Sequence, residues 1–322
     1  MDLTVADEDR IAEAFFPYDN LRIEELKAQG RLLVHYTSVA VAHSILENRE
    51  IWMRNAQTMN DYSEIKHGLA CLEEARKRGI TEKLGAALDA THAGVWSETQ
   101  RLFNSWLPAM FHNTFIACVS EHLGPINQED TLGRLSMWRA YGGVNGVALI
   151  LNPRFLYNPD MGSIATSPVL YADADEFCVQ FTSMIQGLEN IADLLARSPA
   201  NQIANLAFNV LKYSIICTKH PGFAEEKEWR VIYSPDMGAS KYVRESVEII
   251  CDLPQVVQKI QLRNDPNNNI IGLDPSELIE SIIIGPVKFP MTVREILYKD
   301  MLICGFSNIN TRIRESNIPL RI

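Results

Sequence analysis

The sequence lacks the signatures of secreted, membrane-spanning and disulfide-stabilised proteins. Its six cysteines are widely spaced and form no C-x-x-C pair, which is far below the density of a disulfide scaffold. The N-terminal residues are acidic and show no basic-then-apolar order of a signal peptide. No apolar run approaches the roughly 18–20 residues that span a bilayer. We therefore expect a cytoplasmic protein with reduced, mostly buried thiols and no membrane segment.

The short motifs of common enzyme classes are also absent. The chain contains no H-E-x-x-H, no paired-cysteine zinc spacing, no G-x-x-x-x-G-K-[ST], no G-x-G-x-x-G after a strand and no G-x-S-x-G. The glycines of 142–146 come before an apolar strand, which is typical of a hairpin turn rather than of a phosphate loop. The sequence therefore predicts no metal site.

Charge and hydropathy narrow the class of protein further. The chain has 322 residues with 30 Lys+Arg against 40 Asp+Glu, a net charge of −10 and a pI near 5.3. This acidic balance disfavours a broad basic surface for non-specific nucleic-acid binding, although a local basic groove remains open. The hydrophobic fraction of 47% is that of an ordinary globular protein. It excludes disorder as the dominant state.

Apolar runs and helical periodicities predict an α+β fold, because they follow neither strict βαβ alternation nor an all-β pattern. We expect one domain over 1–322, with helical insertions at 80–110 and 175–215. The helix expected from Thr292 to Ile303 leads to a last strand, Ser307 to Ile313. The other strands with the clearest apolar character are 114–120, 147–151, 229–233 and 282–284.

Two polar strings precede helices in the first part of the chain. His35-Tyr36-Thr37-Ser38 ends an apolar strand where a helix begins, so it suits a sugar hydroxyl or an anion as well as a simple helix cap. Asn60-Asp61 also precedes a helix, and capping is its plainer interpretation.

A third string, Glu226-Lys227-Glu228-Trp229-Arg230, leads into an apolar strand. If the strand already includes Glu226, this residue and Glu228 lie on one face, because side chains alternate with a period of two. Carboxylates this close repel each other, which tends to raise one pKa. An exposed acidic edge is the alternative interpretation.

Together, these strings resemble a widespread bacterial domain-of-unknown-function family. The resemblance covers most of the chain from about residue 31, although 80–110 and 175–215 match nothing in it. Its motifs are H-Y-T-S, N-D, S-E, W-x-x-Y followed by Gly, E-x-E-W-R and S-x-I-P-x-R. In this sequence they are His35–Ser38, Asn60-Asp61, Ser120-Glu121, Trp138–Tyr141 with Gly146, Glu226–Arg230 and Ser316–Arg321.

That family in turn resembles the ADP-ribosyltransferase superfamily. The resemblance implies a mixed or antiparallel β core of two packed sheets, and NAD as the substrate. It implies that Glu228 is the catalytic carboxylate, that Glu226 engages the acceptor and that His35 holds a ribose. Tyr36 departs from the pattern, because many members have Gly after the first His. The implied NAD-binding residues are His35, Tyr36, Thr37, Ser38, Asn60, Asp61, Ser120, Trp138, Tyr141 and Arg230.

The chemistry implied is cleavage of the nicotinamide–ribose bond and transfer of ADP-ribose to an acceptor, through an oxocarbenium-like transition state. The acceptor, a protein, nucleic acid, small molecule or water, stays open, as do the oligomeric state and a role as toxin, phage-defence effector or housekeeping enzyme. One rival is a metal-dependent nuclease that reads Glu225-Glu226-Lys227 as an E-x-K motif, with Asp61 or Asp173 as the distant acid. The other is a non-catalytic interaction protein.

Overall fold

The computed structural model of the chain describes residues 3–58, 62–124, 127–157 and 161–319. It confirms the α+β class. The chain folds into two compact units: unit 1 contains residues 1–25, 56–113 and 167–224, and unit 2 contains 26–55, 114–166 and 225–322. Both stretches predicted as helical insertions, 80–110 and 175–215, lie in unit 1.

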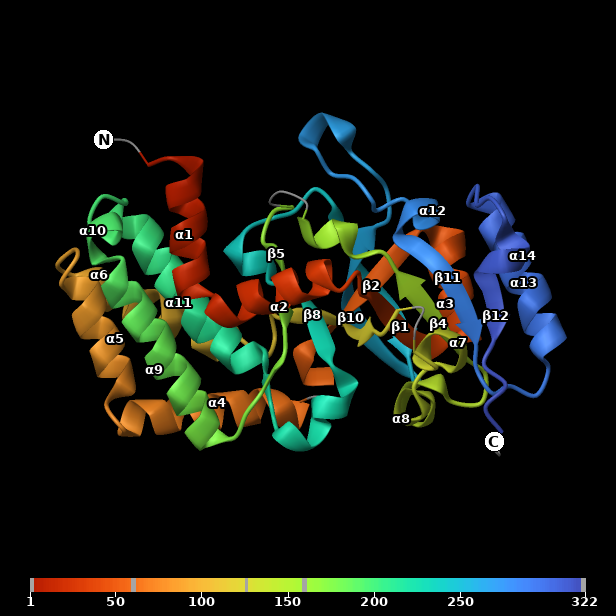
Figure 1. Ribbon diagram of the computed structural model, residues 1–322, viewed down its shortest axis with the longest axis horizontal. Coiled ribbons are helices and arrows are strands. Elements are labelled where there is room, and N and C mark those ends of the chain that lie inside the picture. Colours follow the sequence, from red (N-terminus) through yellow and green to blue (C-terminus); the bar gives the residue numbers. More distant parts are fainter. Residues whose placement is uncertain (1–2, 59–61, 125–126, 158–160, 320–322) are drawn as a thin grey trace. The chain divides into compact units, whose positions relative to one another are not determined.

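Unit 1 is mainly helical (Figure 1). Its longest helices, α4, α9 and α11, bury apolar faces, and the break before α11 falls at Pro199. A two-stranded parallel sheet joins β6 to β7. The elements are α1 (Val5–Phe15), α4 (Tyr62–Lys77), α5 (Ile80–Asp89), α6 (Val95–Trp106), β6 (Leu170–Tyr171), α9 (Ala174–Asn190), α10 (Ala192–Leu195), α11 (Ala200–Ile216) and β7 (Thr218–Lys219), with α2 (Pro17–Ala28) running from unit 1 into unit 2.

Unit 2 is built on a ten-stranded mixed sheet. Its strands are β1 (Leu32–Ser38), β2 (Glu50–Asn55), β3 (Phe115–His122), β4 (Gly146–Leu151), β5 (Ile164–Pro168), β8 (Glu228–Tyr233), β9 (Val243–Ile250), β10 (Leu253–Gln261), β11 (Ile279–Ile284) and β12 (Ile313–Glu315). Its helices are α3 (Val39–Asn48), α7 (Glu129–Leu132), α8 (Leu135–Met137), α12 (Pro275–Leu278), α13 (Pro290–Ile303) and α14 (Ile309–Arg312). The strand predicted at 307–313 is wrong, since α14 occupies most of it and β12 begins only at Ile313.

The sheet of unit 2 divides at β3. One edge of β3 pairs with β8, and the other edge is shared by β2 at residues 115–116 and by β1 at residues 120–122. The first arm of the sheet continues from β1 through β4 and β11 to β12, and the second arm from β2 through β10 to β9. The core strands therefore form one hydrogen-bonded sheet with two arms.

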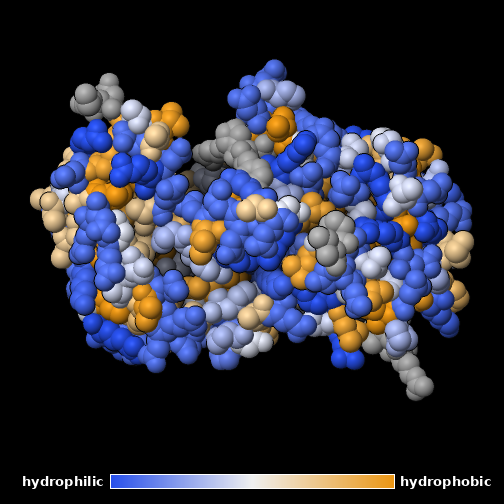
Figure 2. All heavy atoms as spheres, viewed as in Figure 1, coloured by the Kyte–Doolittle hydropathy of each residue, from blue (hydrophilic) through white to orange (hydrophobic). Residues whose placement is uncertain are grey.

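Each unit buries its apolar side chains, and the faces visible in Figure 2 are mostly hydrophilic. One core cluster in unit 2 joins Tyr36 and Trp138 to apolar residues of β1, β4 and β11. A second cluster, around Met53 and Tyr233, joins β2 and β10 of the second arm to β3 and β8. None of the helices in the described ranges is long and apolar enough to cross a membrane.

A carboxylate in unit 1 gives a first testable prediction. Asp19 contacts the Ser167 hydroxyl, and burial raises its pKa from 3.8 to about 6. The neutral form is favoured in the folded state, so the stability it contributes is present below pH 3.8 and is lost as pH rises through about 6. We expect Asp19→Asn to raise the free energy of unfolding at pH 8 by about 1–3 kcal/mol relative to its effect at pH 3.5.

Urea unfolding of both proteins at the two pH values measures this difference. Because the effect of the substitution is compared at two pH values, any change in the free energy of unfolding that the amide causes independently of pH cancels. An equal effect of the substitution at pH 3.5 and pH 8 would show that Asp19 ionises as freely in the folded chain as in the unfolded one.

Candidate functional site

Three neighbouring strands of unit 2 carry most of the predicted motifs. Val34 of β1 pairs with Ser120 of β3, and Ser120 pairs with Glu228 of β8. Directly paired residues of antiparallel strands project from the same face of a sheet, and so do residues two positions apart. Tyr36, Ser120, Glu228 and Arg230 therefore lie on one face, which we call the Glu228 face.

Glu228 and Arg230 form an ion pair on this face. The Arg230 Nε donates to Oε1 of Glu228 at 2.8 Å. The two residues stand two positions apart in β8, with Glu228 5% exposed and Arg230 fully buried. A charge removed from water in this way is tolerated because its partner and its hydrogen bonds compensate it. The pair fixes the direction of the carboxylate.

Two aromatic residues of the motifs belong to the core. Tyr36 meets Trp138 edge to face with ring centres 4.9 Å apart, and both are nearly fully buried. The Trp138 indole N–H donates to the Leu132 carbonyl, and the Tyr36 hydroxyl accepts from the Arg134 amide at 2.8 Å. Burial raises the pKa of Tyr36 to about 12. These contacts hold the β1 strand against the segment before β4.

Tyr141 and Glu226 lie at the surface beside this core. The Tyr141 hydroxyl donates to Oε1 of Glu226 at 3.3 Å, and Tyr141 is 41% exposed. Glu226 ends a 3₁₀ turn, Pro221–Glu226, and Lys227 then takes a left-handed φ of 47° before β8 starts at Glu228. The expectation that Glu226 and Glu228 share a strand face is wrong, because the chain turns between them.

The same turn contains the residues of the nuclease alternative. Glu225 accepts from the Ser136 hydroxyl at 2.8 Å, and Lys227 follows it outside the strand. Burial, followed by the neighbouring Arg134 cation, lowers the pKa of Lys227. Asp173 caps α9 in unit 1. Within the described residues, no group of three or more His, Cys, Asp or Glu side chains is arranged to hold a metal ion.

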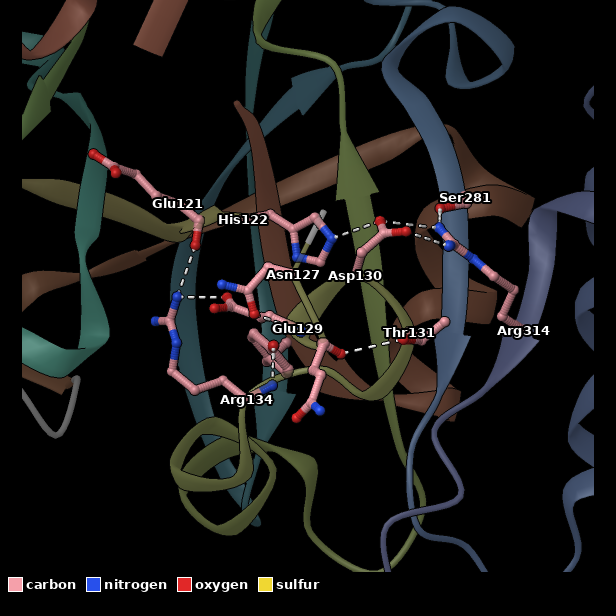
Figure 3. A network of polar contacts seen from close by, with 11 residues as sticks. Glu121, His122, Asn127, Glu129, Asp130, Thr131, Arg134, Ser281 and Arg314 are labelled. Carbon is pink, nitrogen blue, oxygen red and sulfur yellow. Dashed lines mark hydrogen bonds and ion pairs between the residues drawn. The ribbon is translucent and has the colours of Figure 1, made fainter. Parts of the chain in front are cut away.

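Arg134 is the hub of the polar network in Figure 3. Its guanidinium donates to the carbonyls of Glu225, Glu226 and Glu121 at 2.7, 3.0 and 2.9 Å, and to the Glu129 carboxylate at 2.6 Å. It is only 9% exposed. One side chain therefore ties the turn before β8 to the end of β3 and to α7.

Glu121 and His122 extend the network from the end of β3. The buried Glu121 carboxylate accepts from Trp229 at 3.1 Å and from Arg31 at 2.7 Å. His122 contacts Asp130 at 3.3 Å, and burial lowers the pKa of its imidazole. Asp130 in turn accepts from Arg314 of β12 at 2.8 Å (Figure 3).

The C-terminal motif also docks on this region. Ser316 is fully buried and its hydroxyl donates to the Leu132 carbonyl. Ile318 packs against the cluster that contains Tyr36 and Trp138. The motif therefore fastens the loop before α8, while residues 320–321 lie outside the described residues.

His35 and Thr37 lie on the opposite face from Glu228, because they alternate with Val34 and Tyr36 along β1. The His35 Nδ1 bonds to the Cys118 carbonyl at 3.0 Å, and His35 lines a cavity of about 140 Å³. Ser38 caps α3 by accepting from the Val41 amide at 3.2 Å. The predicted Asn60 and Asp61 lie outside the described residues.

The structure thus brings together Tyr36, Ser120, Glu228 and Arg230, with Trp138 packed on Tyr36, and it separates them from His35 by the thickness of the sheet.

Sequence reasoning missed Arg134. Its partners at 225 and 226 lie about 90 positions away, and no local pattern distinguishes it from an exposed arginine. The only local signal is Glu129, five residues earlier.

Comparison with known proteins gives one match. No curated protein and no solved structure matches the chain. None of the comparisons links it to the ADP-ribosyltransferases. The segment 137–231, which begins just before Trp138 and ends just after Arg230, matches the model of a family described as protein of unknown function (DUF2971).

Proposed function

We propose that the chain is an ADP-ribosyltransferase-like enzyme that cleaves the nicotinamide–ribose bond of NAD and passes ADP-ribose to an acceptor. One observation carries the proposal: the strands with the H-Y-T-S, S-E and E-x-E-W-R motifs are neighbours in the order β1–β3–β8, with Ser120 directly paired to Glu228. The resemblance implies two packed sheets, whereas unit 2 has one ten-stranded sheet that divides into two arms at β3, so the proposal rests on the strand order and not on the fold as a whole.

Glu228 is the catalytic carboxylate in this proposal. Loss of nicotinamide leaves positive charge on the anomeric carbon, and a fixed carboxylate stabilises that charge most in the transition state. Arg230 positions the carboxylate through its 2.8 Å hydrogen bond. Since Tyr36 and Trp138 are buried, Tyr141 is the aromatic side chain of the motif set exposed enough to contact a substrate ring.

Glu226 is assigned to the acceptor. It lies at the surface, accepts a hydrogen bond from the Tyr141 hydroxyl at 3.3 Å and precedes Glu228 by two residues. In the proposal it is the base that the incoming nucleophile needs. His35 projects from the other face of β1, so we assign it no contact with the ribose that Glu228 engages.

The test is turnover of NAD labelled in its nicotinamide ring by the full chain and by Glu228→Gln. We expect the variant to lose about 10²-fold or more of the nicotinamide release, because the amide has the shape of the carboxylate and none of its charge. Glu225→Gln is the matched control, since Glu225 is an exposed carboxylate three residues earlier. It should retain the wild-type rate.

Because Glu228 pairs with the buried Arg230, the folded fraction of each variant is checked by circular dichroism. Glu228→Asp keeps the charge and should also be slow, because the carboxylate is retracted by one methylene. Equal nicotinamide release by wild type and a folded Glu228→Gln would remove Glu228 from the chemistry. No release by the wild type with protein, nucleic-acid and water acceptors would reject the proposal.

A further inference from the structure

The division of the sheet creates a cavity inside unit 2. β2 pairs with β3 at residues 115–116 and β1 pairs with it at residues 120–122, so in the described ladders neither strand extends over residues 117–119. The two arms diverge from this gap, and strands of both arms line the space between them. The cavity has a volume of about 140 Å³.

The lining is almost entirely apolar. Ala117 and Val119 face the cavity from β3, Leu149 from the first arm, and Ile51 and Ile260 from the second arm. Among the described residues that line it there is no Asp, Glu, Lys or Arg, so none of them would balance the charge of an ionic ligand, and burying a charge without a counter-charge is strongly unfavourable. The side chain of Cys118 points to the Glu228 face, since Cys118 pairs with Arg230.

His35 supplies a directed polar group in this lining. Its Nδ1 bonds to the Cys118 carbonyl at 3.0 Å, between the part of β3 that pairs with β2 and the part that pairs with β1. A carbonyl only accepts, so Nδ1 carries the proton. Burial lowers the pKa of His35 and keeps the ring neutral at pH 7. Nε2 is then a hydrogen-bond acceptor, and no partner for it occurs among the residues that the structure describes.

We propose that this cavity binds a small uncharged aromatic molecule of one ring with a single hydroxyl or amino group, which donates a hydrogen bond to Nε2 of His35. The volume of about 140 Å³ is close to that of a leucine- and phenylalanine-lined cavity of about 150 Å³ that binds benzene. The apolar walls favour the ring, and the directed Nε2 acceptor of His35 selects for a donor, while Thr166 adds a hydroxyl to the lining.

The experiment measures binding of phenol and of toluene to the full chain by isothermal titration calorimetry at pH 7. We expect both to bind to the wild type, because both fill the cavity. His35→Phe keeps an aromatic ring at this position and removes the acceptor. It should weaken the binding of phenol relative to the binding of toluene by roughly two- to tenfold, the range for one hydrogen bond.

A cavity-filling variant locates the site. Ala117→Leu adds three carbons on the cavity side of β3 and should abolish binding of both compounds. Cys118→Ala is the matched control on the same strand. Cys118 also lines the cavity, but its side chain points to the other face with Arg230, and the substitution keeps the carbonyl that accepts from His35. This variant should bind both compounds as the wild type does. Unchanged binding to a folded Ala117→Leu would place the ligand elsewhere and overturn the proposal.

A spectroscopic readout needs no variant of His35. In histidine-labelled wild type, the ¹⁵N resonance of the His35 Nε2 should shift with phenol and stay nearly fixed with toluene. Absence of that shift would contradict the assignment. So would a failure of both compounds to bind at ligand concentrations about 10-fold above 1 mM. These assays contain no NAD, so their outcome is separate from that of the Glu228 experiment.

Discussion

Arg134→Ala should lower the free energy of unfolding by about 3–5 kcal/mol. The guanidinium is buried, with four hydrogen bonds to Glu121, Glu129 and the turn at 225–226. Its removal takes the Arg134 cation away from the Glu129 carboxylate, whose side chain is 10% exposed, and takes a donor away from three carbonyls. An unpaired buried charge is far more costly than the pair itself.

Urea unfolding followed by tryptophan fluorescence measures this effect, since Trp138 and Trp229 lie close to the network. Arg139→Ala is the control, because Arg139 is an exposed arginine five residues further on, and it should change stability by no more than about 0.5 kcal/mol. Arg134→Lys keeps one charge and cannot reach all four acceptors, so its loss should be intermediate. A loss below about 1 kcal/mol for Arg134→Ala would mean that the network is dispensable.

Gly68→Ala should be the second large effect, with a loss of about 2–3 kcal/mol. A Cβ on Gly68 of α4 would lie 2.2 Å from the Ile215 carbonyl oxygen and 2.9 Å from its carbon in α11. Both atoms belong to a helix backbone, which cannot yield as a flexible side chain does. The two helices would have to separate, and this cost exceeds the gain of about 1 kcal/mol that alanine brings to a helix interior.

Gly187→Ala provides the matched comparison for this prediction. Gly187 lies within α9, and a Cβ there meets nothing within 4 Å. The same substitution should therefore stabilise the chain by about 0.5–1 kcal/mol. Thermal unfolding of both variants is sufficient, because they are predicted to shift the midpoint in opposite directions. Shifts of the same sign would mean that the close approach of α4 and α11 does not govern the result.

Much of the fold could be predicted from local pattern. The apolar, β-branched runs predicted β3, β4 and β8 within two residues of their observed bounds, and β11 from three residues after its observed start. The helices of 80–110 and 175–215 also follow their periodicity. The N-terminal helix α1 was missed, although Thr4 and Asp7 form a capping box at its start. Elements determined by distant partners were not predictable, and β12 is one of them, because it exists through parallel pairing with β11.

The candidate site was less predictable for the same reason. Motif spacing identified Glu228 and Ser120, but their pairing depends on the register of strands more than 100 residues apart. Lys227 has a left-handed φ that turns the chain, and Glu226 therefore lies outside the strand. The face of the sheet on which His35 lies follows from the register of β1 with its neighbours, and the sequence of β1 alone does not determine that register.

Helix α3 connects β1 to β2 along the chain, both of these strands pair with the same edge of β3, and Ile45 of α3 lines the cavity. The side chain at position 45 is therefore part of the cavity wall and of no strand pairing. If the cavity binds the proposed ligand, a substitution at this helix position is expected to change the size of the ligand that fits while the strand pairings and the Glu228 face stay the same.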